Sequence, residues 1–195
     1  MIGRLRRLFK APRHEERPVF AALGSESVIG SFRFLDGAKN ITIGSKCMIR
    51  DDAWISAFPH FFPEMDSSLP RIVIEDDVYV GFSSFISAIR GVRICEGTLI
   101  SDGFYASDHT HGFDPREGSP RHQPLSSKGP VEIGKNCFIG FRVSVLPGVT
   151  LGQGCVVGAH SVVTRSFPEF SMLAGVPARR IKSFNFSRGS WGDCE

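Results

Sequence analysis

The second half of the chain repeats one pattern of apolar and polar positions every six residues. The second place of each hexamer is often glycine, and the fifth is mostly small or β-branched. A period of six fits neither a helix of 3.6 residues per turn nor the simple alternation of an ordinary strand. It predicts a coil of short strands. The first places are Ile133, Ile139, Val145, Leu151, Val157 and Val163, and the fifth places are Cys137, Val143, Val149, Cys155 and Ser161.

The first half follows the same step with two shifts of frame. Each shift moves the pattern by two residues and places two apolar residues one apart, as in Ile41 and Ile43 or Val92 and Ile94. The step therefore continues across both shifts. The apolar positions are Leu23, Ile29, Leu35 and Ile41; Ile43, Ile49 and Ile55; Ile74, Val80, Ile86 and Val92; and Ile94 and Ile100.

This pattern predicts an all-β fold, a parallel β-helix of roughly six rungs, each closed by three hexamers in about 18 residues. The leading aliphatic residue of each hexamer points inward, and stacked rungs bury a column of Ile, Val and Leu that no single rung could bury. The glycine turns the corner, where a Cβ would crowd or where φ above zero is needed. The general rule for parallel crossovers predicts a right-handed coil.

The repeat sets the expected domain organisation. The coil covers residues 23–183, with insertions at 58–71 and 101–130, and residues 184–195 form a tail that caps or crosses the last rung. Residues 1–22 are an extension with an apolar stripe at Ile2, Leu5 and Leu8, expected as a short helix on the first rung. Because the coil is uniform, we expect function in its interruptions.

Composition and charge narrow the class of protein. The chain has 195 residues, 42% hydrophobic and 22% charged, which is an ordinary globular composition. The net charge of +3 gives no argument for nucleic acid, although arginines cluster near both ends. Five cysteines without a CxxC pair favour neither a disulfide framework nor a zinc knuckle. Those at fifth places, such as Cys137, are interpreted as small core fillers.

The motifs resemble those of the left-handed β-helix acyltransferases with hexapeptide repeats, over most of 23–183. "SDHTHGFDP", "QPLSSKGPVEIG" and above all "LAGVPARRI" are similar to the sugar O-acetyltransferases, which include galactoside, maltose, lipopolysaccharide and capsule enzymes. The resemblance implies a left-handed coil and acetyl transfer from acetyl-CoA. It also implies a homotrimer in which the loop at 101–130 reaches the site of the next subunit.

Acetyl transfer to a hydroxyl needs a base, and imidazole titrates close to neutral pH. The resemblance points to His109 as this base, although Asp108 stands where those relatives carry glycine, and His111 remains the alternative. Asp108 either orients an imidazole, binds acceptor hydroxyls or shapes the turn. Backbone N–H groups at a coil corner can stabilise the oxyanion.

The resemblance also suggests residues that bind coenzyme A. Phe138 stands where relatives place a Trp against the pantetheine groove, and Arg165 where they carry a Lys. Gly140 and Gly158 offer close backbone approach, and Arg179 and Arg180 suit phosphate groups. For each of these two arginines, a solvated turn is the alternative.

The acceptor side is less defined. Ser83 or Ser84 lies where the galactoside enzymes have a sugar-contacting Asn, and Ala88 and Ile89 lie where they have paired acids. Both features are absent, so the expected acceptor is not a simple galactoside. Tyr105, like Trp54 and Phe85, either stacks on a sugar or packs internally.

The expected function is therefore coenzyme-A-dependent O-acetylation of a sugar or cell-surface polysaccharide intermediate, without a covalent acyl-enzyme. The alternatives are N-acylation of an amino sugar or other amine and a non-enzymatic β-helical scaffold. A γ-carbonic-anhydrase-like metal enzyme would need His109, His111 and His122 as ligands; no metal is expected.

The expected location is the cytoplasm. The basic start of the chain is too broken for a secretory signal, and no apolar run reaches the roughly 18 residues that span a bilayer. Contact with the inner face of the membrane is at most peripheral, through residues 2–10.

Overall fold

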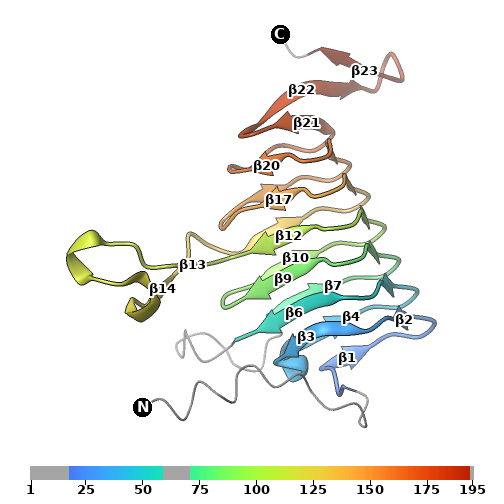
Figure 1. Cartoon of the computed structure of the whole chain (residues 1–195). Coiled ribbons are helices and arrows are strands. Elements are labelled where there is room, and N and C mark those ends of the chain that lie inside the picture. Colours follow the sequence, from blue (N-terminus) through green and yellow to red (C-terminus); the bar gives the residue numbers. More distant parts are fainter. Residues whose placement is uncertain (1–17, 59–70, 194–195) are drawn as a thin grey trace.

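The computed structural model describes residues 18–58 and 71–193. Most of the extension expected at 1–22 and most of the insertion expected at 58–71 lie outside these residues, as do Cys194 and Glu195. Three parallel sheets wrap around a common core, and the chain visits them in turn as it climbs from the N-terminal to the C-terminal end (Figure 1). The expected parallel β-helix is confirmed.

Each sheet collects every third strand of the coil. Sheet A comprises β1 (Ala22–Leu23), β4 (Ile41–Ile43), β7 (Ile72–Ile74), β10 (Val92–Ile94), β15 (Val131–Ile133) and β18 (Thr150–Leu151). The parallel strands of sheet B are β2 (Val28–Ile29), β5 (Met48–Ile49), β8 (Tyr79–Val80), β11 (Leu99–Ile100), β16 (Phe138–Ile139), β19 (Val156–Val157) and β21 (Ser171–Gly175). Sheet C comprises β3 (Phe32–Asp36), β6 (Ala53–Ala57), β9 (Phe85–Ala88), β12 (Tyr105–Ser107), β17 (Ser144–Val145) and β20 (Val162–Val163).

Two antiparallel strands close the C-terminal end. Strand β22 (Ala178–Asn185) pairs with β21, and β23 (Ser190–Asp193) pairs with β22. Strand β22 crosses the expected boundary between the coil, which was to end at residue 183, and the tail, which was to begin at residue 184. The described part of the tail thus continues sheet B beyond the last parallel strand (Figure 1).

The inward places of the repeat form the core. All six leading aliphatics from Ile133 to Val163 are 0% exposed, which confirms the expected orientation. The two shifts of frame also have a simple structural form. Ile41 and Ile43 begin and end the three-residue strand β4, so both point inward and the intervening Thr42 points outward.

The second-place glycines serve close approach and not positive φ. A Cβ on Gly140 would lie 2.7 Å from the backbone nitrogen of Ala159 in the next rung, and a Cβ on Gly152 would lie 2.3 Å from that of Glu169. Positive φ occurs two residues later in the turn, at non-glycine residues such as Arg142 (φ 53°) and His160 (φ 58°). The alternative explanation, that these glycines supply positive φ, is wrong.

We expect Gly152→Ala to destabilise the coil by about 1–3 kcal/mol, because the new methyl group would overlap the backbone of the adjacent rung. Gly158→Ala is the matched control, since its Cβ would meet only ordinary contacts of 3.4 Å or more. Thermal unfolding followed by circular dichroism measures both variants. Equal melting temperatures for the two would contradict the close-approach explanation.

The coil continues further into the expected second insertion than the sequence suggested. Residues 101–104 form a corner, and Tyr105–Ser107 forms β12 between β9 and β17 of sheet C. Phe104 fills an inward place that is elsewhere small, and Ala106 replaces the usual leading aliphatic residue; both are buried. Because of this exchange of sizes, the six-residue repeat could not be recognised in the sequence at these positions. The insertion begins at Asp108, not at residue 101.

The remaining insertion, residues 108–130, forms a projecting arm. It contains β13 (Thr110–His111) paired antiparallel with β14 (Leu125–Ser126), and the 3₁₀ turns η4 (Pro115–Glu117) and η5 (Pro120–His122). The arm leaves the coil where sheet C leads into sheet A, which we call the C–A corner (Figure 1). The 3₁₀ turn η2 (Ala38–Asn40) occupies this corner in an earlier rung.

The described cysteines are core residues. Cys47, Cys95, Cys137 and Cys155 are all buried. Burial raises the pKa of the Cys47 thiol, and it raises that of Cys95 to about 11. These two thiols stay protonated near neutral pH, which agrees with a packing role.

Candidate active site

The base of the arm holds a buried carboxylate next to a histidine. Asp108 is 0% exposed, and its Oδ1 lies 2.8 Å from Nδ1 of His109. A carboxylate can only accept here, so the Nδ1 atom of His109 carries the proton. The lone pair of this imidazole is then on Nε2, which forms no hydrogen bond with the described residues. The His109 side chain is 13% exposed.

Three backbone N–H groups hold the same carboxylate from the rung below. Asp108 accepts from the backbone of Ile89 at 3.0 Å, of Arg90 at 2.6 Å and of Gly91 at 2.6 Å. These residues form the turn that follows β9. The carboxylate is therefore fixed before any ligand binds, and with it the ring of His109.

Two serines complete the base of the arm. The hydroxyl of Ser107 donates to the carbonyl of His109 at 2.9 Å and lies 3.3 Å from its Nδ1 atom. The hydroxyl of Ser127 donates to the carbonyl of Asp108 at 2.5 Å. Both strands of the arm are thereby tied to the Asp108–His109 pair where they leave the coil. Sequence reasoning missed Ser107, Ser127 and the turn at 89–91.

His111 lies in a different environment from His109. It is exposed on β13, opposite Leu125, and its ring forms no hydrogen bond or ion pair with the described residues. His122 is also exposed, at the end of η5. No three His, Cys, Asp or Glu side chains of residues 18–58 and 71–193 are grouped so that they could hold a metal ion. Within one chain, the three histidines that the carbonic-anhydrase alternative needs do not form such a group.

The residues suggested for coenzyme A do not lie at the C–A corner with His109, with one exception. Phe138 is 45% exposed on the outer face of sheet B, between Leu99 and Val156. Gly140 and Gly158 lie where sheet B leads into sheet C, the B–C corner. The exception, Arg165, follows β20 at the C–A corner, with its guanidinium 5.2 Å from the centre of the Phe167 ring.

Arg179 and Arg180 are exposed on β22 at the C-terminal end. Arg179 donates to the carbonyl of Ala178 at 3.0 Å. In a single chain, the residues expected to bind coenzyme A therefore lie apart from one another, on sheet B, at two corners and in the closing hairpin.

The suggested acceptor residues are also separated. Ser83 and Ser84 lie at the B–C corner between β8 and β9, away from the arm. Ser84 is 1% exposed and donates to the carbonyl of Gly81, so its hydroxyl is part of the turn. Ser83 is exposed, has a φ of 53° and donates to Asp52 at 2.8 Å. Only Tyr105 lies on the strand that leads to Asp108.

The aromatic residues of sheet C stack on each other. Ring centres are 4.3 Å apart for Phe34 and Trp54, 5.6 Å for Trp54 and Phe85, and 5.1 Å for Phe85 and Tyr105. Trp54 and Phe85 have a neighbouring ring on both faces, so neither of them has a ring face left to stack on a sugar. Tyr105 ends the column, because the next residue in register is Ser144.

Comparison with known proteins places these features in a family. The family model described as the hexapeptide repeat of succinyl-transferase matches residues 130–165. WbbJ of Escherichia coli K12, which carries the provisional name of a lipopolysaccharide biosynthesis O-acetyl transferase, is 36% identical over 157 residues, covering 74% of this chain and 80% of that protein. The chain belongs to the hexapeptide-repeat acyltransferase family and is an enzyme of that family.

Other relatives are matched over a smaller part of their length. An acetyltransferase of Mycobacterium tuberculosis H37Rv, also named provisionally, is 36% identical over 112 residues, but the chain covers only 37% of it.

Solved structures agree on the fold. The N-acyltransferase AntD of Bacillus cereus, in complex with dTDP and 3-hydroxybutyryl-CoA, has a TM-score of 0.70 at 20% identity, covering 87% of this chain and 86% of that one. A hexapeptide-repeat acetyltransferase of Vibrio cholerae, complexed with acetyl coenzyme A, has a TM-score of 0.52 at 25% identity, covering 85% and 72%. The coil is left-handed, as in this family, so the handedness implied by the resemblance is confirmed and the general crossover rule fails here.

Proposed function

We propose that this chain is an O-acetyltransferase that transfers the acetyl group of acetyl-CoA to a hydroxyl of a sugar or a cell-surface polysaccharide intermediate. The observation that carries the proposal is the Asp108–His109 pair. Nδ1 of His109 lies 2.8 Å from Oδ1 of the fixed Asp108 carboxylate and donates its proton to it, so Nε2 is left to accept a proton. The similarity to WbbJ over most of both chains supports a glycan acceptor. The likeness to AntD at 20% identity shows the fold alone.

In the proposed reaction His109 acts as a general base. Its Nε2 atom takes the proton of the acceptor hydroxyl as that oxygen attacks the thioester carbon, forming the new C–O bond. The tetrahedral intermediate then loses the coenzyme A sulfur, and the imidazolium returns its proton to that sulfur. Asp108 is a positioning residue, since it holds the tautomer and stabilises the imidazolium while the proton is on the ring. No acyl-enzyme forms.

We further propose a homotrimer with three sites between subunits. His109 lies at the C–A corner, whereas Phe138, Gly140 and Gly158 lie on sheet B and at the B–C corner. A second copy would supply the surface that one chain places elsewhere. Light scattering is expected to give three times the chain mass of 21.4 kDa. A monomer that is fully active would contradict the shared site.

The donor is a cytoplasmic metabolite, so the proposed location is the cytoplasm, with peripheral contact at the membrane through the basic N-terminal residues. Among the described residues, the structure contains no helix with the length and hydropathy to cross a bilayer.

Activity is tested with purified chain, acetyl-CoA and sugar acceptors. Free coenzyme A is expected to appear in step with an acetyl ester, which is labile to mild base. Amino sugars in the same panel distinguish N-acylation, because an amide resists that treatment. Release of coenzyme A with amino sugars alone would contradict O-acetylation.

A further inference from the structure

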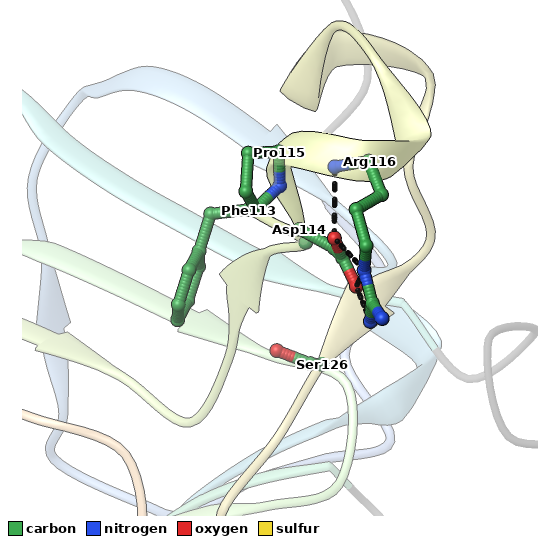
Figure 2. Close-up of a pocket in the computed structure, with 6 residues that line it drawn as sticks. Phe113, Asp114, Pro115, Arg116 and Ser126 are labelled. Carbon is green, nitrogen blue, oxygen red and sulfur yellow. Dashed lines mark hydrogen bonds and ion pairs between the residues drawn. The ribbon is translucent and has the colours of Figure 1, made fainter.

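The arm carries a pocket that neither the base nor the donor residues occupy. Its lining residues border an open hollow of about 490 Å³ between the segment that follows β13 and Ser126 of β14 (Figure 2). Phe113 and Pro115 lie on one side, and the carboxylate of Asp114 and the guanidinium of Arg116 lie on the other, above Ser126 (Figure 2). The lining residues are Gly112, Phe113, Asp114, Pro115, Arg116 and Ser126.

Buried hydrogen bonds fix the wall of this pocket. The side chain of Gln123, 8% exposed, accepts from the backbone nitrogen of Asp114 at 2.8 Å and donates to its carbonyl at 2.8 Å. The same amide group donates to the carbonyl of Gly118 at 3.0 Å. The segment that carries Phe113 and Arg116 is thereby held in one shape without a ligand, which lowers the entropic cost of binding.

The side chains in this segment suit a sugar ring. Phe113 is 76% exposed, and an aromatic face of this kind packs against the apolar C–H face of a sugar. Asp114 and Arg116 form a bidentate ion pair, which also caps η4 through the backbone nitrogen of Arg116. The side chains of Arg116 and Asp114 remain 87% and 31% exposed, so the outer N–H groups of the guanidinium and the remaining lone pairs of the carboxylate can bind a ligand. The pair is neutral overall, which favours an uncharged polyol over an ion.

The pocket lies close to the base along the chain but is lined by other residues. Phe113 follows His109 by four residues, so the two are at most about 14 Å of chain apart. None of the lining residues belongs to the Asp108–His109 pair. A glycan of two or more residues can therefore present one hydroxyl to His109 and place a further sugar in the pocket.

We infer that this pocket is a second sugar subsite, so that the acceptor is an oligosaccharide or a longer glycan and not a monosaccharide. The inference rests on the proposed function and specifies its substrate class. One end of the glycan presents a hydroxyl to His109, and a sugar further along packs on Phe113 and hydrogen-bonds to Asp114 and Arg116.

The test compares acceptors of different length with the full chain. The probes are methyl glycosides of glucose, galactose, mannose and N-acetylglucosamine, and di- and trisaccharides built from the same sugars. The measured quantity is the ratio of kcat/KM for the best oligosaccharide to that for its monosaccharide. Wild type is expected to favour the oligosaccharide, and Phe113→Ala is expected to lower the ratio about tenfold, as loss of an aromatic contact would.

Two controls accompany this variant. Phe113→Trp keeps an aromatic face and is expected to retain the ratio. Phe186→Ala removes another exposed phenylalanine, 68% exposed beyond β22, and is expected to leave the ratio unchanged.

The outcomes separate the two levels of the proposal. Acetylation of sugars with a ratio that Phe113→Ala does not lower overturns the subsite and leaves the proposed function standing. No coenzyme A release with any sugar contradicts the proposed function and the subsite with it. If Phe113→Ala instead reduces the oligomer mass in light scattering, the pocket is a contact between copies and the subsite is overturned.

Discussion

Replacing His109 by Ala is expected to lower kcat for acetyl transfer on the order of a hundredfold or more, because no other group of residues 18–58 and 71–193 at the base of the arm is placed to take the acceptor proton. The fold should not change. The side chain is partly exposed and makes one strong contact, to Asp108. Release of coenzyme A measured under saturating acetyl-CoA gives the loss, and circular dichroism gives the melting temperature.

Two histidines on the same arm serve as controls. His111→Ala tests the alternative base, and we expect a reduction of less than about threefold, because an exposed imidazole without a fixed partner is not oriented for proton transfer. His122→Ala, at the end of η5, should behave like wild type. If His111→Ala loses as much activity as His109→Ala, then the base assignment is wrong or is shared between the two residues.

Asp108→Asn is expected to produce the second-largest loss, about a hundredfold in kcat. The side-chain amide of the new asparagine would place an NH₂ group where the backbone N–H groups of residues 89–91 need an acceptor. The amide also no longer requires the imidazole of His109 to carry its proton on Nδ1. The ring then loses the tautomer that leaves Nε2 free to accept. KM for acetyl-CoA should change much less, because the suggested donor residues other than Arg165 lie away from the C–A corner.

The Asp108 variant differs from the His109 variant in stability. In the wild type, the carboxylate of Asp108 accepts hydrogen bonds from three backbone N–H groups of the turn at 89–91. The melting temperature should therefore fall by several degrees in Asp108→Asn and not in His109→Ala. Long-range ¹⁵N–¹H correlation spectra of the imidazole report the tautomer directly. A wild-type spectrum with the proton on Nε2 would contradict the positioning role, whatever the kinetics.

Much of the coil could be predicted from sequence because each hexamer carries its own local signal. The six aliphatics from Ile133 to Val163 are evenly spaced, and all six are inside. The six-residue pattern is not visible at Phe104 and Ala106. Phe104 occupies a position where other hexamers have a small residue, and Ala106 occupies a position where they have a large aliphatic one. Their combined volume fits the core, but neither residue follows the pattern by itself.

The candidate site was only partly predictable. Asp108 and His109 stand out in sequence as a polar break in the repeat, but a single sequence does not state which partners such a pair finds. One clue was present. Arg90 and Asp108 are 18 residues apart, which is one turn of the coil, so the turn at 89–91 had to lie directly below the carboxylate. The hydrogen bonds of Gln123 to Asp114 and Gly118 could not be predicted from any spacing in the sequence, because these partners lie in irregular backbone.

The C–A corner has a consequence for how such enzymes diversify. Chain added at this corner leaves the ladder hydrogen bonds of the three sheets in place, since β12 and β15 pair with their neighbours on either side of the arm. The sequence and length of the arm can therefore change while the coil stays the same. Natural variation or deliberate grafting between Thr110 and Ser126 can change which acceptor binds while the imidazole and its carboxylate stay attached to the coil below.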